Sequence, residues 1–173
     1  SKPLNHIFKN EKSVLILVGK TFGHIEQSCF LKENYSIIEG APPEINLINE
    51  KNNGDTVLDL INKELVLSAH DVSNGGLIVS LSEMSISSKI GVKIDKPKNL
   101  RNFTEYLFGE DQGRFILEIN LKNLVTVEKI LKSNEVYFEK IGHTQKNFFE
   151  IEGEMKTDVN DLFKINNQWY NNY

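Results

Sequence analysis

The sequence lacks several features that would assign it to common functional classes. Its single cysteine, Cys29, excludes an internal disulfide framework and favours a reducing compartment, so we expect a cytoplasmic protein. Its longest apolar run, Val14–Val18, is far shorter than the ~20 residues of a membrane-spanning helix, so we expect no membrane partner. The formal net charge is −4, and no basic surplus predicts nucleic-acid binding.

The composition is that of a soluble globular domain. The chain has 173 residues, of which 39% are hydrophobic and 25% charged, enough to build a substantial core. We divide it into residues 1–12, a linker or docked arm, residues 13–157, an α+β domain, and residues 158–173, a C-terminal tail with one amphipathic turn.

Hydrophobic patterns predict a mixed sheet layered with helices. Val14–Val18 is a continuous aliphatic run, typical of a strand buried on both faces. Other strands are expected at 92–94, 115–119, 136–141 and 148–151, the last two as a hairpin-like pair. Helices are expected at 25–32, 57–65, 77–88 (ended by Gly91), 103–108 and 125–131. Because helices and strands do not alternate strictly, the fold class is α+β.

The most informative segment is a glycine turn. An apolar strand end at 65–67 leads through Ser68-Ala69-His70-Asp71-Val72-Ser73-Asn74-Gly75-Gly76 into an amphipathic helix. In this geometry, backbone N–H groups can face an anion, and Asp71, Ser73 and Asn74 can hold a hydrated cation. The alternative is a plain tight turn in which Ser73 or Asn74 caps the helix and the glycines supply positive φ.

A second polar turn precedes the strand at 115–119. Glu110, Asp111 and Gln112 lie between two glycines and are followed by Arg114. The two carboxylates could bind Mg²⁺ through water or accept hydrogen bonds from ribose hydroxyls. Alternatively, they pair with Arg114 in a solvated turn. Neither turn supplies a nucleophile with its base, so no residue is assigned as catalytic.

Three other candidates favour structural roles. Gly19-Lys20-Thr21 follows a strand, but a phosphate-binding loop needs a glycine where Val14 stands. Cys29, expected in mid-helix beside apolar neighbours, is interpreted as a buried structural thiol. The four histidines lack metal-ligand spacing, and His70 is expected to be a hydrogen-bonded structural residue, so no metal ligand is assigned.

Together the two turns resemble a known family. SAHDVSNGGLIVSLSEM (68–84) and LFGEDQGR (107–114) are similar to two motifs of the synthetase subunit of small-type phosphoribosylformylglycinamidine synthase. GAPPEINL (40–47) and the opening strand with GKTFGH (19–24) are similar to the segment before them. The resemblance covers essentially the whole chain, in order. It implies the C-terminal domain fold of the aminoimidazole ribonucleotide synthetase superfamily.

The resemblance also implies an activity for the full-length protein. That family converts formylglycinamide ribonucleotide, ATP and glutamine-derived ammonia into formylglycinamidine ribonucleotide, an ATP-dependent C–N ligation of purine biosynthesis. ATP and Mg²⁺ serve the full enzyme. Its partners are a glutaminase subunit and a small accessory subunit. This chain matches only the last of four domains, so we expect it to be inactive alone, to hold no cofactor alone and to pack on upstream domains of the same polypeptide.

Two departures from the family pattern affect the candidate site. Asn74 stands where the glycine turn usually has Asp, and Glu110, Asp111 and Gln112 match a Glu-Ser-Gln trio that touches substrate in the earlier copy. Because Asp111 would repel a phosphate, this half fits a non-catalytic site that holds a structural nucleotide. The phosphate- or nucleotide-binding candidates are Asp71, Ser73, Asn74, Gly75, Gly76, Glu110, Asp111 and Gln112.

Two other functions remain open. The chain could be a stand-alone nucleotide-binding or regulatory module, or a small ATP-dependent kinase of the same superfamily, although it lacks an acidic metal-binding first domain. A domain separated from its neighbours should expose apolar surface. We expect that surface on the helix at 76–88 and on the arm at 4–8.

Overall fold

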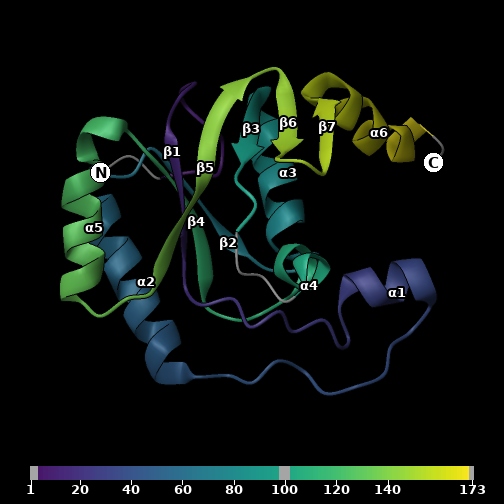
Figure 1. The fold of residues 1–173 in the computed structure, drawn as a ribbon, viewed down its shortest axis with the longest axis horizontal. Helices are drawn as coiled ribbons and strands as arrows, with labels where there is room; N and C mark the ends of the chain where they lie inside the picture. Colours follow the sequence, from purple (N-terminus) through teal and green to yellow (C-terminus); the bar gives the residue numbers. More distant parts are fainter. Residues whose placement is uncertain (1–3, 98–101, 172–173) are drawn as a thin grey trace.

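A computed structural model describes residues 4–97 and 102–171, and it contains one mixed seven-stranded sheet in the order β2-β4-β1-β5-β3-β6-β7 (Figure 1). The strands are β1 Val14–Val18, β2 Ser68–Val72, β3 Ile90–Ile94, β4 Arg114–Ile119, β5 Phe138–Lys146, β6 Phe148–Ile151 and β7 Met155–Asp158. The helices are α1 Cys29–Tyr35, α2 Leu47–Asn62, α3 Gly76–Ser88, α4 Phe103–Phe108, α5 Leu124–Ser133 and α6 Val159–Asn171. Neighbouring strands are antiparallel except β3 and β6, which are parallel.

Strand β1 lies at the centre of the core, as its sequence predicts. All five of its residues are buried, between β4 on one side and β5 on the other. Leu15 and Leu17 belong to one hydrophobic cluster, whereas Val14, Ile16 and Val18 belong to another. Because alternate side chains of a strand point to opposite faces, β1 contributes to the core on both faces of the sheet.

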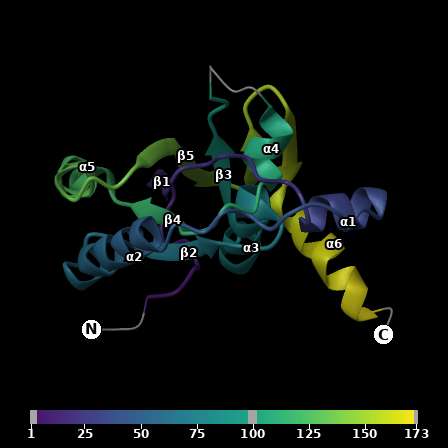
Figure 2. The same ribbon diagram turned by 90° about the horizontal axis from the view of Figure 1, so that it is seen from below.

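Each face of the sheet is covered by helices. Helices α2 and α5 pack together on one face, and α3, α4 and α6 pack on the other (Figure 2). Leu77, Leu81 and Met84 are the core-facing stripe of α3 and are buried. The sequence therefore predicted correctly both the layered architecture and the face that α3 buries.

The arm before β1 packs against the domain. Phe8 is only 3% exposed and belongs to the cluster under α3. The buried Glu118 carboxylate accepts hydrogen bonds from Lys9 N (2.9 Å), Asn10 N (3.0 Å) and Ser68 Oγ (2.8 Å). An apolar anchor and a buried carboxylate thus hold residues 8–10 in place.

Helix α1 begins later than expected, and helix α2 begins earlier. Helix α1 starts at Cys29, because Gln27 adopts a positive φ of 55° and Ser28 Oγ accepts from Leu31 N as the cap. Cys29 is therefore the first residue of a helix, not a mid-helix residue. Helix α2 starts ten residues before the expected Val57, capped by Asn46. Its first turns expose their apolar residues, so the helical pattern of buried positions is absent there.

Several strand expectations were wrong. β5 and β6 are not a hairpin pair, because β3 lies between them and pairs with both. β2 occupies 68–72, not 65–67, and thus includes the first part of the glycine-turn motif. Helix α3 ends at Ser88, where Lys89 adopts a φ of 59° as the C-cap residue, whereas Gly91 lies within β3. Residues 159–171 of the tail form the long helix α6, not a single turn, and α6 packs on α3.

No helix within residues 4–97 and 102–171 is long and apolar enough to cross a membrane.

Candidate functional site

The glycine turn joins β2 to α3. The turn follows Val72, and α3 begins at Gly76, as expected. Gly75 and Gly76 adopt positive φ values of 79° and 72°. A Cβ at Gly76 would lie 2.7 Å from the carbonyl oxygens of Leu107 and Gly109, so only glycine fits this close approach.

The helix cap is not the expected one. Gly75 occupies the N-cap position of α3, and no side chain caps the helix, so the prediction that Ser73 or Asn74 caps it was wrong. The backbone explains the difference, because a left-handed Gly75 turns its own N–H towards a neighbouring loop. That N–H donates to Glu110 Oε1 at 2.8 Å.

Glu110 connects three segments that are distant in sequence. Its Oε1 accepts from Gly75 N and from Cys29 N, both at 2.8 Å. Its own backbone N donates to His24 O at 2.8 Å. Burial and the nearby Glu110 carboxylate raise the pKa of the Cys29 thiol. This favours the neutral thiol, but Cys29 is half-buried, so the prediction that it is a buried thiol was wrong.

Asp111 is enclosed by backbone donors. Its Oδ2 accepts from Phe22 N (3.0 Å) and Gly23 N (2.9 Å), and its Oδ1 accepts from His24 N (3.2 Å). The residue is only 5% exposed. Three successive N–H groups around one carboxylate form a concave anion-binding arrangement of the backbone, here filled by a side chain of the same chain.

Arg114 lies beneath this carboxylate and is 1% exposed. Its Nη1 is 4.0 Å from Asp111 Oδ2 and donates to Thr21 Oγ1 at 3.2 Å. Its Nε donates to Asp111 O (3.2 Å) and its Nη2 to Gly109 O (2.5 Å). Burial lowers the pKa of the Arg114 guanidinium, and the Asp111 charge opposes that shift. The Asp111–Arg114 pair predicted by one interpretation therefore exists, but it is buried and not solvated.

We call these three segments, residues 19–24, 73–76 and 109–114, the turn cluster. Among the eight candidate residues, Gly75, Gly76, Glu110 and Asp111 make contacts inside it. The other four, Asp71, Ser73, Asn74 and Gln112, are exposed. Sequence reasoning missed the backbone donors of Phe22–His24, because main-chain groups leave no signature in side-chain patterns.

The remaining candidates lie outside the turn cluster's hydrogen bonds. Lys20 is exposed, and its Nζ lies 5.0 Å from the centre of the Phe22 ring. His70 Nδ1 lies 2.7 Å from Asp71 O, and its Nε2 lies 3.1 Å from Glu83 Oε2, which is the structural role expected for it. In the part of the chain that the structure describes, no three His, Cys, Asp or Glu residues are placed to hold a metal ion together.

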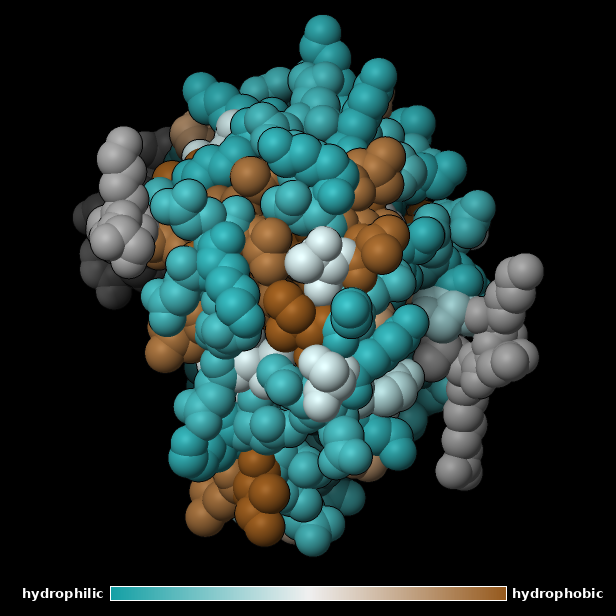
Figure 3. All heavy atoms as spheres, turned by 90° about the vertical axis from the view of Figure 1, so that its left-hand side faces the viewer, coloured by the Kyte–Doolittle hydropathy of each residue, from teal (hydrophilic) through white to brown (hydrophobic). Residues whose placement is uncertain are grey.

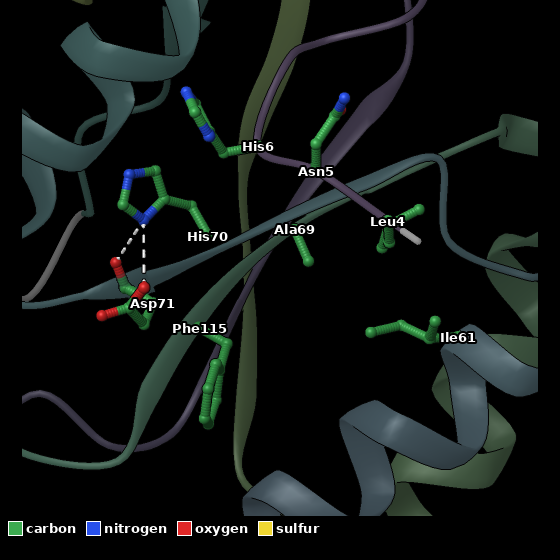
Figure 4. Close-up of a pocket in the computed structure, with 8 residues that line it drawn as sticks. All are labelled: Leu4, Asn5, His6, Ile61, Ala69, His70, Asp71 and Phe115. Carbon is green, nitrogen blue, oxygen red and sulfur yellow. Dashed lines mark hydrogen bonds and ion pairs between the residues drawn. The ribbon is translucent and has the colours of Figure 1, made fainter. Parts of the chain in front are cut away.

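An open hollow of about 500 Å³ adjoins His70 (Figure 4). Its polar side is formed by Asn5, His6, His70 and Asp71, and the His6 and His70 rings are 5.2 Å apart. Its apolar side is lined by Leu4, Ile61, Ala69 and Phe115. Asp71 thus faces this hollow at the outer edge of β2, not the backbone cradle around Asp111.

Sequence comparisons agree with the resemblance stated from the motifs. The PurL subunit of phosphoribosylformylglycinamidine synthase from Pelagibacter ubique is 46% identical over 165 residues, which cover 95% of this chain and 23% of that protein. The corresponding subunit from Rhodopseudomonas palustris is 38% identical over 166 residues, 96% of this chain and 23% of that protein. The chain therefore spans about a quarter of the length of these curated relatives.

Comparison with solved structures confirms the α+β fold. Thermotoga maritima PurL complexed with FGAR superposes with a TM-score of 0.80 at 15% identity, over 92% of this chain and 29% of that one. A thiamine-monophosphate kinase from Stenotrophomonas maltophilia superposes with a TM-score of 0.61 at 14% identity, over 87% of this chain and 53% of that one. At these identities the likeness concerns the fold alone.

A family profile matches residues 11–152, which include every strand except β7 and both turns of the candidate site. It is described as the AIR synthase related protein, C-terminal domain. The match covers most of the chain, and the predicted resemblance is confirmed. The chain belongs to the family of AIR synthase related C-terminal domains.

Proposed function

We propose that the chain is the last C-terminal-type domain of a phosphoribosylformylglycinamidine synthase synthetase subunit. The whole enzyme would use ATP, Mg²⁺ and glutamine-derived ammonia to convert formylglycinamide ribonucleotide into formylglycinamidine ribonucleotide. One observation carries the proposal: the 46% identity to Pelagibacter ubique PurL extends over 95% of this chain. At that identity, equivalent packing in the two proteins is expected throughout the domain.

The proposal gives this domain a supporting role in the reaction. The half-buried Glu110 and the buried Asp111 carboxylates accept hydrogen bonds from backbone donors, so neither is placed to act as a general base. Asp71, Ser73, Asn74 and Gln112 are exposed polar side chains beside the turns. We propose that these four face a nucleotide bound between domains, whereas Gly75, Gly76, Glu110 and Asp111 shape the loops behind them.

The nucleotide and the partners are proposed by analogy with solved relatives. Structures of T. maritima PurL have been solved with ATP and with ADP, and another contains PurLQS from the same organism. We propose that the whole protein likewise binds ATP with Mg²⁺ and works with a glutaminase and a small accessory subunit in the cytoplasm.

An exposed apolar segment supports packing against upstream domains. Between residues 32 and 52, which we call the strap, only Pro43 is even partly buried. The strap crosses the lower edge of the molecule from α1 to α2 (Figure 1). Its large exposed side chains are Tyr35, Ile37, Ile38, Ile45, Leu47 and Ile48. Apolar surface gathered on one segment in this way is typical of an interface.

The apolar surface is not where the sequence analysis expected it. Phe8 of the arm is buried, and α3 buries most of its apolar side chains, with Val79 37% exposed. Figure 3 looks onto the side of α2 and α5, where apolar atoms are visible both near the centre and at the lower end, the level at which α2 begins. Leu47 and Ile48, at that end, are 74% and 82% exposed.

A chimera tests the proposed function. The last quarter of P. ubique PurL would be replaced by this chain and introduced into a purine-auxotrophic bacterium that lacks PurL. We expect growth without added purine, whereas the isolated chain should form no ADP in the presence of substrate and ammonia. The matched control carries the corresponding quarter of R. palustris PurL. If the control supports growth and a folded chimera does not, the proposal is wrong.

A further inference from the structure

The cradle around Asp111 has the composition of a phosphate site. It offers three successive backbone N–H groups from Phe22, Gly23 and His24, and the buried Arg114 guanidinium lies on the inner side. Thr21 Oγ1 accepts from that guanidinium at 3.2 Å. Adjacent N–H groups that converge with a cation bind oxyanions in many proteins.

We propose that Asp111 is a built-in anion that fills this cradle, so that the domain takes no phosphate group there. The carboxylate supplies the negative charge and two oxygen acceptors that a bound phosphate would otherwise provide. Its enclosure leaves 5% of the residue exposed, and displacement by a ligand would leave its charge buried beside no donor. The inference concerns this chain alone and does not depend on the proposed enzyme.

The built-in anion also explains how the loops keep their shape. Hydrogen bonds of Asp111 and Arg114 join the 22–24 backbone, the turn at 109–111 and the strand at Arg114, and Glu110 N adds one bond to His24 O. A phosphate-dependent cradle would be ordered only when occupied. Here the same bonds are intramolecular, so the loops are ordered without any ligand.

Removing the carboxylate should open a latent oxyanion site. In Asp111→Ser the three N–H groups lose their acceptor and Arg114 loses its neighbouring carboxylate, and the shorter side chain leaves room for an anion. We expect inorganic phosphate to raise the Tm of this variant by about 3 °C more than it raises the Tm of the unmodified chain at equal ionic strength. The matched control, Asp111→Asn, also removes the charge but keeps the volume filled, so it should show no such gain.

A core variant separates site binding from the general stabilisation that phosphate gives proteins. Leu131→Ala lowers stability through a cavity in a core cluster that contains none of the cradle residues. Its Tm should respond to phosphate as the unmodified chain does. If Asp111→Ser responds no more than Leu131→Ala, or if Asp111→Asn responds equally, the proposal is wrong.

The unmodified chain provides a measurement that needs no variant to fold. Backbone amide NMR signals of Phe22, Gly23 and His24 would be followed while inorganic phosphate is titrated to a large excess. We expect these three signals to stay unchanged. Saturable shifts at these amides would show that phosphate enters the occupied cradle and would overturn the proposal.

Discussion

The turn cluster and the strap are neighbours in the fold but differ in how their polar and apolar groups are satisfied. In the turn cluster, two carboxylates and a buried guanidinium find all their partners within the chain. In the strap, six large apolar side chains are exposed, and few contacts tie it down, such as Ala41 N to Glu26 Oε2 at 2.7 Å. The first region is therefore complete in itself, whereas the exposed apolar side chains of the second support our proposal that it packs on another domain.

His24 and Gly113 of the turn cluster contact the strap. His24 donates its backbone N–H to Asp111 inside the turn cluster, while its ring Nε2 lies 2.8 Å from Ala41 O of the strap. Gly113 of the turn cluster packs closely on Glu50 of the strap. A Cβ added to Gly113 would lie only 3.2 Å from Glu50 Cα. The turn cluster therefore contacts the strap at two points, while the apolar side chains of the strap remain exposed.

The largest effect is expected from breaking the turn cluster at its charge pair. Asp111→Ala leaves the buried Arg114 guanidinium without a carboxylate and three backbone donors without an acceptor. We expect the free energy of unfolding to fall by about 3–5 kcal/mol, measured by urea denaturation in chloride buffer. A loss below about 1 kcal/mol would show that the cluster is not a buried charge network.

A smaller loss is expected from the backbone contact between the two turns. Gly76→Ala places a Cβ 2.7 Å from two carbonyl oxygens at φ 72°. Gly153 is the matched control, because its φ is 73° and nothing lies within 4 Å of an added Cβ. Both variants should lose about 1–2 kcal/mol from the left-handed backbone, and Gly76→Ala should lose about 1–3 kcal/mol more from the clash. Equal losses would contradict the close approach of the turns.

Cys29 reports on the position of Glu110 with a still smaller effect. Burial raises the pKa of the thiol first, and the Glu110 charge raises it further. Glu110→Gln removes that second contribution, so the thiol pKa should fall and iodoacetamide should react faster near neutral pH. Glu128→Gln, on α5, is the control and should leave the pH dependence of alkylation unchanged. An unchanged or slower reaction in Glu110→Gln would contradict the position of Glu110 beside Cys29.

The smallest effect on stability is expected in the strap. Leu47→Ser with Ile48→Ser should change the free energy of unfolding by no more than about 0.5 kcal/mol per site, because both side chains are exposed. The same pair should weaken self-association of the isolated chain, measured by light scattering over a concentration series. Val125→Ser is the control, since Val125 is 77% exposed on α5. If Val125→Ser changed the scattering equally, self-association would not depend on the strap.

Part of the fold could be predicted from the sequence, because the spacing of hydrophobic residues indicates which side chains are buried. The aliphatic run of β1 and the stripe of Leu77, Leu81 and Met84 predicted the central strand and the inner face of α3. The start of α2 was missed for the same reason, because its apolar Leu47 and Ile48 face outwards and interrupt the helical pattern. Periodicity therefore fails to predict a helix where its apolar side chains are exposed in this chain.

The sequence predicted which residues belong to the candidate site, but not which hydrogen bonds join them. The motifs predicted that the two turns form the candidate site, and Asp111 was expected to repel phosphate. They could not show that Glu110 accepts from Gly75 and Cys29, since these contacts join positions 35 and 81 residues apart in sequence. The partners of Asp111 are main-chain groups, which any residue supplies, so no residue type marks them.

Amide hydrogen exchange in the isolated chain and in the P. ubique PurL chimera tests the central claim most directly. The account predicts that the strap amides between the two helices, residues 38–46, exchange rapidly in the isolated chain and become strongly protected in the chimera. The amides of Phe22, Gly23, His24 and Gly75 should be equally protected in both proteins, because their acceptors belong to this chain. Strap amides that stay unprotected in a folded, active chimera, or cluster amides protected only there, would contradict it.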